Sequence, residues 1–317
     1  LPTYKIVAER YPINKRNRRC KELLEMVKKE NIDSAIIQTR FWTTSYIASK
    51  FVDKNNIPAC LIEHGSTHFT VNNKVLDFFG EIYEHMLTNS IKKRVKDFYG
   101  VSKKCTEWLK HFGIEAKGVF YNSVNTDEIE EYSKFINKDT GKLIITYTGR
   151  MIEEKGVPRL IEAFKNLDSK YENLELDLAG DGPILEKIIQ ENKDVKNIKV
   201  LGKISHQEVM ELLGKTNIFV NPSHFSEGLP TTILEAGMMK CAVVATPMGG
   251  TTEIITDDNI GYICGFETSE IQEKIEKIIN DKEKMKKLGI NIKEKVEKDF
   301  SWNTTAKKIA TTIKYSK

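Results

Sequence analysis

Short runs of apolar residues alternate with amphipathic stretches along the whole chain. In the first part of the chain, such runs occur at 34–38, 58–64, 97–102 and 117–123. Between them, apolar residues recur with helical spacing at 20–30, 78–87 and 103–112. Continuous apolar strands separated by helices are typical of a parallel sheet covered on both faces. The pattern therefore predicts a Rossmann-like α/β domain over residues 1–135.

The same pattern restarts after residues 125–142, a polar, turn-rich segment that we interpret as a linker. Further apolar runs follow at 142–149, 174–180, 198–202, 217–223 and 241–246. They predict a second Rossmann-like domain over 136–299, and a helix over 300–317 that packs back toward the first domain. We expect the two domains to face each other across a cleft, because ligands of parallel α/β sheets bind at the carboxyl ends of the strands.

The composition of the chain narrows its class. A length of 317 residues suits two domains, and 40% hydrophobic with 30% charged residues is typical of a globular protein. A net charge of +4 gives no indication of nucleic-acid binding. The five cysteines form no C-x-x-C pair, which predicts a reduced, cytoplasmic chain. The chain starts with Leu-Pro-Thr instead of Met, and we expect that an N-terminal segment is missing.

Two common nucleotide motifs do not fit this sequence. Gly180 and Gly182 follow an apolar run, but the third small residue of a dinucleotide fingerprint is replaced by Leu185. We therefore expect a tight turn between a strand and a helix at this point. No G-x-x-x-x-G-K-[ST] pattern occurs, which argues against a P-loop nucleotidase.

Two cations follow the apolar run 142–149. Arg150 comes directly after Gly149, and Lys155 precedes a glycine and a predicted helix. Cations at the end of a strand, beside the start of a helix, suit a diphosphate. Taken alone, the pair also fits ordinary surface charges.

The stretch "SHFSEGLPTTILEAGMMK" places two carboxylates around the start of another helix. Pro230 suits the first turn of a helix over 231–239, whose free N–H groups favour an anion. Glu235, inside that helix, is suited to accept hydrogen bonds from the vicinal hydroxyls of a ribose. Glu227, before the helix, is suited to a group attached to a diphosphate. Acidic residues near helix starts are also common without any such role.

Taken together, these motifs resemble the retaining glycosyltransferases of the GT-B fold, and most closely their fourth family (glycosyl transferases group 1). The spacing from "GRMIEEKG" to "EGLPTTILE" and then "ATPMGGTTEII" carries the resemblance, which spans the second domain and, more loosely, the first. The segments "VSKKCTEWL" and "YNSVNTDEI" resemble two further family segments. In the second of them, Ser123 and Asn125 replace the usual Gly and Asp.

The resemblance implies a role for each matching residue. Arg150 and Lys155 would hold the donor diphosphate, and Glu235 would hold the ribose. Glu227 would lie beside the donor sugar. The backbone N–H groups of Gly228 and Leu229 would reach the sugar or its phosphate.

His64 follows a predicted strand of the first domain, in a region where family members often carry a histidine near the donor. We therefore include His64 among the catalytic candidates, although a loop histidine without a role is the alternative. His64 and His68 are four residues apart, but Gly65 between them argues against a helical zinc motif. No D-x-D sequence occurs, which fits a site that neutralises the donor diphosphate with Arg, Lys and a helix terminus instead of a metal. No cofactor is expected.

The sequence thus predicts a retaining, metal-independent transferase that moves a sugar from a nucleotide-diphosphate sugar, a UDP-sugar, to a glycan or lipid-linked acceptor. Surface polysaccharide or glycolipid synthesis is the expected context. The basic run 14–21 suggests peripheral contact with the inner face of a membrane, or a solvated helix start. The alternatives are a non-catalytic nucleotide-sugar-binding module, a fragment that depends on a partner chain, and another GT-B-like enzyme, such as a sugar-nucleotide epimerase.

Overall fold

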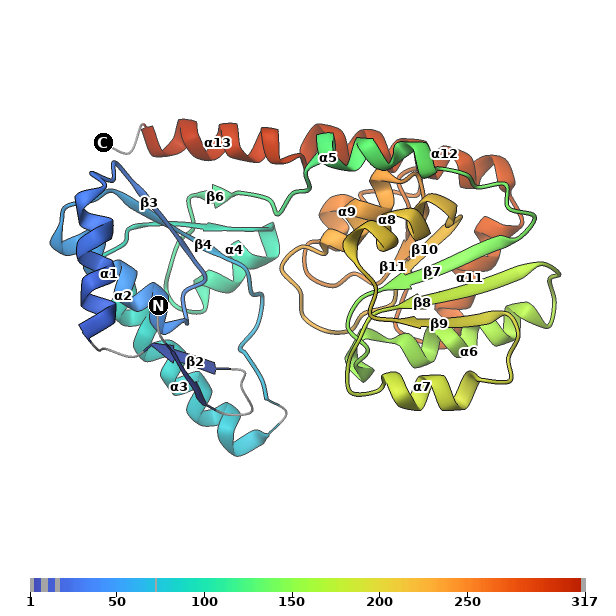
Figure 1. The fold of residues 1–317 in the computed structure, drawn as a ribbon, viewed down its shortest axis with the longest axis horizontal. Helices are drawn as coiled ribbons and strands as arrows, with labels where there is room; N and C mark the ends of the chain where they lie inside the picture. Colours follow the sequence, from blue (N-terminus) through green and yellow to red (C-terminus); the bar gives the residue numbers. More distant parts are fainter. Residues whose placement is uncertain (1–2, 7–10, 15–17, 72, 315–317) are drawn as a thin grey trace. The chain divides into compact units, whose positions relative to one another are not determined.

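The computed structural model describes residues 3–6, 11–14, 18–71 and 73–314 (Figure 1). The chain divides into two compact units. Unit 1 extends to Tyr121 and also takes the C-terminal residues from Ala306, whereas unit 2 comprises Asn122–Thr305. Each unit contains its own parallel sheet with helices packed against it, which confirms the predicted α/β class.

Unit 2 is built on a six-stranded sheet in which every pairing is parallel. Its strands, in the order in which they lie side by side, are β12 (Tyr262–Ile263), β11 (Ala242–Ala245), β10 (Ile218–Asn221), β7 (Leu143–Thr148), β8 (Leu174–Ala179) and β9 (Ile198–Gly202). All residues of β8, β10 and β11 are buried, as expected for strands with both faces covered.

The helices of unit 2 cover this sheet. They are α6 (Val157–Asp168), α7 (Leu185–Asn192), α8 (His206–Lys215), α9 (Thr231–Met238), α10 (Thr251–Ile254), α11 (Thr268–Ile279) and α12 (Lys282–Asp299). Helices α6 and α11 pack against each other, and α9 packs against α12. The apolar face of α6 includes Leu160 and Phe164, which are fully buried in the same core as Ile271 of α11.

Residues 126–135 do not form the expected linker. They fold into α5 (Thr126–Glu130) and the 3-10 helix η1 (Glu131–Phe135), which pack on α9 and α8 of unit 2. Ile129 is buried, and the backbone N–H of Asn137 donates to the carbonyl of Gly214 at 3.0 Å. The boundary consequently lies at 121/122 and not at 135, because polar composition does not reveal the few apolar residues that anchor the segment.

Unit 1 contains a four-stranded parallel sheet of β3 (Ala35–Gln38), β4 (Ala59–Glu63), β5 (Asp97–Gly100) and β6 (Gly118–Val119). Its helices are α1 (Arg18–Lys29), α2 (Thr43–Lys54), α3 (Lys74–Ile91) and α4 (Lys103–Lys110). Leu61, Phe98 and Leu109 are buried in its core. A separate antiparallel pair consists of β1 (Thr3–Ile6) and β2 (Tyr11–Asn14).

The last helix, α13 (Trp302–Lys314), crosses the division between the units. Its first residues belong to unit 2, where the hydroxyls of Thr305 and Ser123 form a hydrogen bond of 2.7 Å. Farther along, Ile309 and Ile313 pack on a unit 1 cluster that includes Cys60 and Phe120. In the described part of the chain, no helix is both long and apolar enough to cross a bilayer.

Candidate active site

Two glycines shape the loop that follows β7. Gly149 has φ +154°, and a side chain there would collide with the hydroxyl of Tyr147. Gly156 has φ +72°, and a Cβ at this position would lie 2.1 Å from the carbonyl oxygen of Pro222. Since β10 pairs with β7, this close approach seats the loop after β7 against the loop after β10. Residues far apart in sequence therefore meet at the carboxyl ends of neighbouring strands.

The structure brings three of the predicted site residues together in these loops. Lys155, at the end of the 3-10 helix η2 (Glu153–Lys155), forms an ion pair with Glu227. Both side chains are mostly buried, with 14% and 15% of their surface exposed. The guanidinium of Arg150 and the ammonium of Lys155 lie 5.0 and 5.5 Å from the ring centroid of Phe225. These charges are therefore organised around one aromatic ring, unlike scattered surface charges.

Tyr147 connects this cluster to the strand. Its hydroxyl donates to the backbone carbonyl of Arg150 at 2.9 Å. Burial raises the pKa of the tyrosine, and the negative charge of Glu227 raises it further, while Arg150 partly opposes both. The phenol consequently stays protonated and fixes the backbone from which Arg150 projects.

Residues 227–230 are held by the glycines that follow β11. Gly249 has φ +56°, and a Cβ there would approach the carbonyl oxygen of Glu227 to 2.2 Å. The N–H of Gly250 donates to the carbonyl of Gly228 at 2.8 Å, and Leu229 is buried. The "GG" of the sequence thus positions the loop that carries the predicted carboxylate.

Helix α9 begins directly after this loop. Pro230 is the N-cap residue, with φ −74° and ψ 106°, so the helix starts at Thr231 and Pro230 precedes its first turn. The proline ring presets an extended backbone angle at the point where the chain turns into the helix. The helix ends at Met238, one residue earlier than predicted.

Glu235 lies one turn into α9 and has a different partner from Glu227. Its side chain is 18% exposed, and one oxygen lies 3.2 Å from Nε2 of His206 at the start of α8. Burial raises the pKa of Glu235, and His206 lowers it in part. The two carboxylates of the motif are therefore held separately, one by a lysine and one by a histidine that the sequence analysis missed.

A cavity of about 370 Å³ opens beside Arg150. It lies at the carboxyl ends of β7, β8 and β9 and is lined by Thr148, Gly149, Arg150, Ala179, Gly180, Asp181, Lys203, Ile204 and Val209. The tight turn expected at Gly180 and Gly182 is confirmed, with the N–H of Gly180 bonded to the carbonyl of Gly202. The lining residues Asp181, Lys203 and Ile204 were not predicted, although the rule that ligands bind at strand ends points to all three.

His64 lies in unit 1, directly after β4. Its Nε2 is 2.6 Å from Oε1 of Gln38 on the neighbouring strand β3, and burial lowers the pKa of its ring. His64 thus has a partner within its own unit, and its role toward a donor stays a prediction.

The basic run 14–21 falls partly outside the described residues. Its described end enters α1, where Arg18 pairs with Glu22 at 2.9 Å. Arg18 is exposed, which suits both a solvated helix start and contact with a membrane, and the membrane contact stays a prediction.

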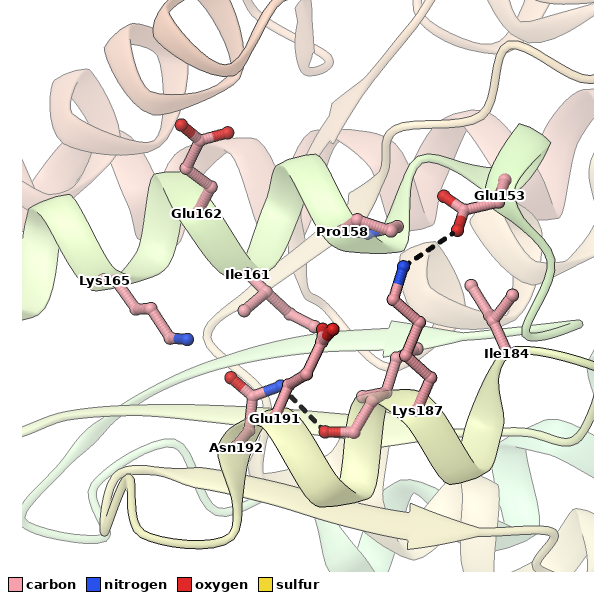
Figure 2. Close-up of a pocket in the computed structure, with 10 residues that line it drawn as sticks. Glu153, Pro158, Ile161, Glu162, Lys165, Ile184, Lys187, Glu191 and Asn192 are labelled. Carbon is pink, nitrogen blue, oxygen red and sulfur yellow. Dashed lines mark hydrogen bonds and ion pairs between the residues drawn. The ribbon is translucent and has the colours of Figure 1, made fainter.

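A second hollow, of about 230 Å³, lies between α6 and α7 (Figure 2). Glu153 and Lys187 approach to 3.6 Å at one end, and Ile161 and Ile184 contribute apolar wall. None of the predicted site residues lines it. We therefore assign the candidate site to the loops after β7 and β10.

Comparison with known proteins shows the family to which the chain belongs. The family described as "Glycosyl transferases group 1" matches residues 105–295. The uncharacterized glycosyltransferase MJ1178 of Methanocaldococcus jannaschii is 30% identical over 283 residues, which cover 87% of this chain and 74% of that protein. The capsular polysaccharide biosynthesis glycosyltransferase CapM of Staphylococcus aureus is 30% identical over 54% of this chain and 45% of its own length.

Solved structures show the same fold. Anabaena HepE in complex with UDP superposes with a TM-score of 0.73 at 16% identity, over 93% of this chain and 82% of that one. The predicted GT-B fold is thereby confirmed.

Proposed function

The chain belongs to the glycosyl transferases group 1 family, and from this premise we propose that it is a retaining, metal-independent glycosyltransferase that uses a UDP-sugar. The acceptor is a glycan or a lipid-linked sugar. No cofactor takes part in the proposed reaction. The observation that carries the proposal is the cluster of Arg150, Lys155 and Glu227 at the carboxyl ends of neighbouring strands.

The donor diphosphate binds to this cluster. Arg150 is exposed at the rim of the cavity, whereas Lys155 is mostly buried and paired with Glu227. A diphosphate competes with Glu227 for the lysine, and the start of α9 offers additional N–H groups to the anion. Glu227, once Lys155 has turned to the diphosphate, orients the hydroxyls of the donor sugar.

The nucleoside occupies the cavity next to Arg150. A volume of about 370 Å³ lies within the range of small-molecule sites. Helix α8 supports this placement, because Val209 lines the cavity while His206, one turn earlier, contacts Glu235. Glu235 holds the ribose. HepE, which shares the fold, has been solved with UDP and with UDP-glucose, and this supports uridine as the base.

Transfer proceeds through stabilisation of the leaving group. As the glycosidic bond breaks, negative charge grows on the diphosphate, and Arg150, Lys155 and the start of α9 oppose it. Removing one such stabilising group typically costs about 100–1,000-fold in turnover. The acceptor attacks the face from which the phosphate departs, so the anomeric configuration is retained and Glu227 acts by orientation.

The biological context follows from the relatives. CapM is named for capsular polysaccharide biosynthesis, and a relative of Bacillus subtilis is named for teichuronic acid biosynthesis. We extend this to surface polysaccharide or glycolipid synthesis, with the acceptor bound by unit 1 and His64 among its contacts.

Thermal unfolding with UDP, GDP, ADP and NAD tests the donor site. UDP at 100 times its dissociation constant should stabilise the fold by about 2.7 kcal/mol, a shift of a few degrees. The other three should shift the midpoint less. No shift with any nucleotide, from a chain that melts cooperatively, would overturn the proposal.

Mass spectrometry then separates a transferase from a binding module. A UDP-sugar with a panel of glycan and lipid-linked acceptors should give a product heavier by one sugar. Binding of the UDP-sugar without transfer or release of UDP would favour the non-catalytic alternative.

A further inference from the structure

Three of the six histidines converge in unit 1, although they are far apart in the sequence. His68 lies in the loop after β4, His85 on α3, and His111 at the C-cap of α4. Nε2 of His111 is 3.2 Å from Nε2 of His68 and 3.2 Å from Nε2 of His85. All three ligand nitrogens lie within 4.8 Å of one another.

The two separations of 3.2 Å match those between the ligands of a metal site. Zinc binds histidine nitrogen at about 2.0–2.1 Å in tetrahedral geometry, which places neighbouring ligand nitrogens about 3.3 Å apart. Nε2 of His111 has either one N–H or one lone pair, so it cannot make a linear hydrogen bond to both of the other two nitrogens. A cation between the three rings accepts a lone pair from each of them.

A buried carboxylate orients one of the rings. Nδ1 of His68 is 3.1 Å from Oε2 of Glu84, and a carboxylate only accepts, so Nδ1 carries the proton. Glu84 is held in turn by Nη1 of Arg40 at 3.1 Å and by the N–H of Phe69 at 2.9 Å. The Nε2 lone pair of His68 consequently points toward His111. A carboxylate behind a ligating histidine is the usual support of such a ligand.

Aromatic neighbours hold the other rings and leave an entry path. The ring of His111 stacks on Trp108 with centroids 4.8 Å apart and an interplanar angle of 5°. The ring centroid of His85 lies 4.7 Å from that of Phe112. His111 is exposed, so an ion can reach the nitrogens from solvent.

We propose that His68, His85 and His111 bind one divalent transition-metal ion, Zn²⁺, with water in the fourth position. The ion ties the loop after β4 to α3 and α4, and thereby stabilises unit 1. The site differs from the His64–His68 pair that the sequence analysis weighed and set aside, since His64 bonds to Gln38. It takes no part in the proposed sugar transfer and is independent of it.

Titration calorimetry of the untagged, chelator-treated full chain with ZnCl₂ tests the site. We expect one Zn²⁺ per chain. His85→Gln and His111→Gln should each weaken binding at least tenfold, and His111 is exposed enough to be replaced without threatening the fold. His224→Gln, which removes a histidine of unit 2, is the matched control and should bind as the wild type does.

Three further readouts sharpen the result. Glu84→Gln should weaken the binding of Zn²⁺ about 10–100-fold, as is usual when a ligating histidine loses the carboxylate that holds it. Co²⁺ should give a visible spectrum typical of tetrahedral coordination, and Zn²⁺ should raise the melting temperature of the wild type but not of His111→Gln. Absence of Zn²⁺ binding, or equal affinity in wild type, His85→Gln and His111→Gln, would overturn the proposal.

Discussion

The charged cluster of unit 2 and the buried polar cluster of unit 1 are built on opposite principles. In unit 2, the paired Lys155 and Glu227 keep about one-seventh of their surface exposed, beside the exposed Arg150. In unit 1, the side chains of Arg40, Glu63 and Glu84 are fully buried. Charges within reach of solvent can exchange partners with a ligand, whereas fully buried charges must be satisfied within the fold.

The same difference appears in the behaviour of the acids. Burial raises the pKa of Glu63, against the opposing charge of Arg40 and the N–H groups of Gly65 and Arg40. The guanidinium of Arg40 also lies 3.7 Å from the ring centroid of Phe112. We therefore expect unit 1 to depend on Arg40 for its stability, whereas the cations of unit 2 are proposed to bind the donor diphosphate.

Replacing Arg40 tests this comparison most severely. Arg40→Met should lower the free energy of unfolding of unit 1 by about 3–5 kcal/mol, because Glu84 is left buried without its cation. Urea unfolding followed by tryptophan fluorescence measures it, since Trp42 and Trp108 belong to unit 1. Arg18→Met is the control; Arg18 is 94% exposed and should contribute less than about 1 kcal/mol. Equal midpoints for Arg40→Met and Arg18→Met would contradict the structural role of Arg40.

The next largest effect concerns the lysine of unit 2. Lys155→Met should reduce turnover of the UDP-sugar about 100–1,000-fold while leaving the fold intact, because the leaving diphosphate loses a cation. Release of UDP measures the turnover. Lys187→Met, from the groove between α6 and α7, should retain full activity. If both variants lost activity equally, the loss would be explained by a general effect of surface charge and not by contact between Lys155 and the diphosphate.

A buried carboxyl inside the sheet of unit 2 gives a pH test. Burial, and then the charge of Glu175, raise the pKa of Asp177 from 3.8 to about 6. The native state therefore binds this proton more readily than the unfolded chain. The resulting stability is present below pH 3.8 and is lost as the pH rises through 6.

Asp177→Asn removes this dependence. Relative to wild type, the free energy of unfolding of the variant should gain about 2–3 kcal/mol between pH 4 and pH 7. Chemical unfolding at several pH values, followed by circular dichroism, measures the gain. Asp258→Asn, at a side chain that is 73% exposed, should show none. A difference between Asp177→Asn and wild type that does not vary with pH would show that this carboxyl does not titrate in that range.

The smallest effects distinguish the two carboxylates of the motif. Glu235→Gln should weaken the binding of UDP itself about tenfold, since a charged hydrogen-bond acceptor for the ribose is lost. Glu227→Gln should not weaken the binding of UDP, because Lys155 then has no carboxylate partner to give up. It should, however, remove the additional affinity that the sugar gives to the UDP-sugar. Calorimetry with both ligands measures this, with Glu191→Gln as control. Equal loss of UDP affinity in Glu227→Gln and Glu235→Gln would show that the two carboxylates do not have separate roles.

Prediction from sequence succeeded for structural elements that depend on residues close to one another along the chain. Apolar runs predicted the four strands of the unit 1 sheet and five of the six strands of the unit 2 sheet. It missed α2 in unit 1, whose first residues are Thr, Thr and Ser, and the four-residue strand β2. Short or weakly apolar segments carry too little periodicity to be recognised.

The sequence by itself determined the α/β class and the residues that end the strands of unit 2, because glycines, prolines and apolar runs act locally. Only the tertiary structure decided that Lys155 pairs with Glu227 and Glu235 with His206, and that residues 126–135 belong to unit 2. It also decided that His68, His85 and His111 meet. Partners separated by tens of residues are chosen by sheet order and helix packing, and no local pattern encodes them.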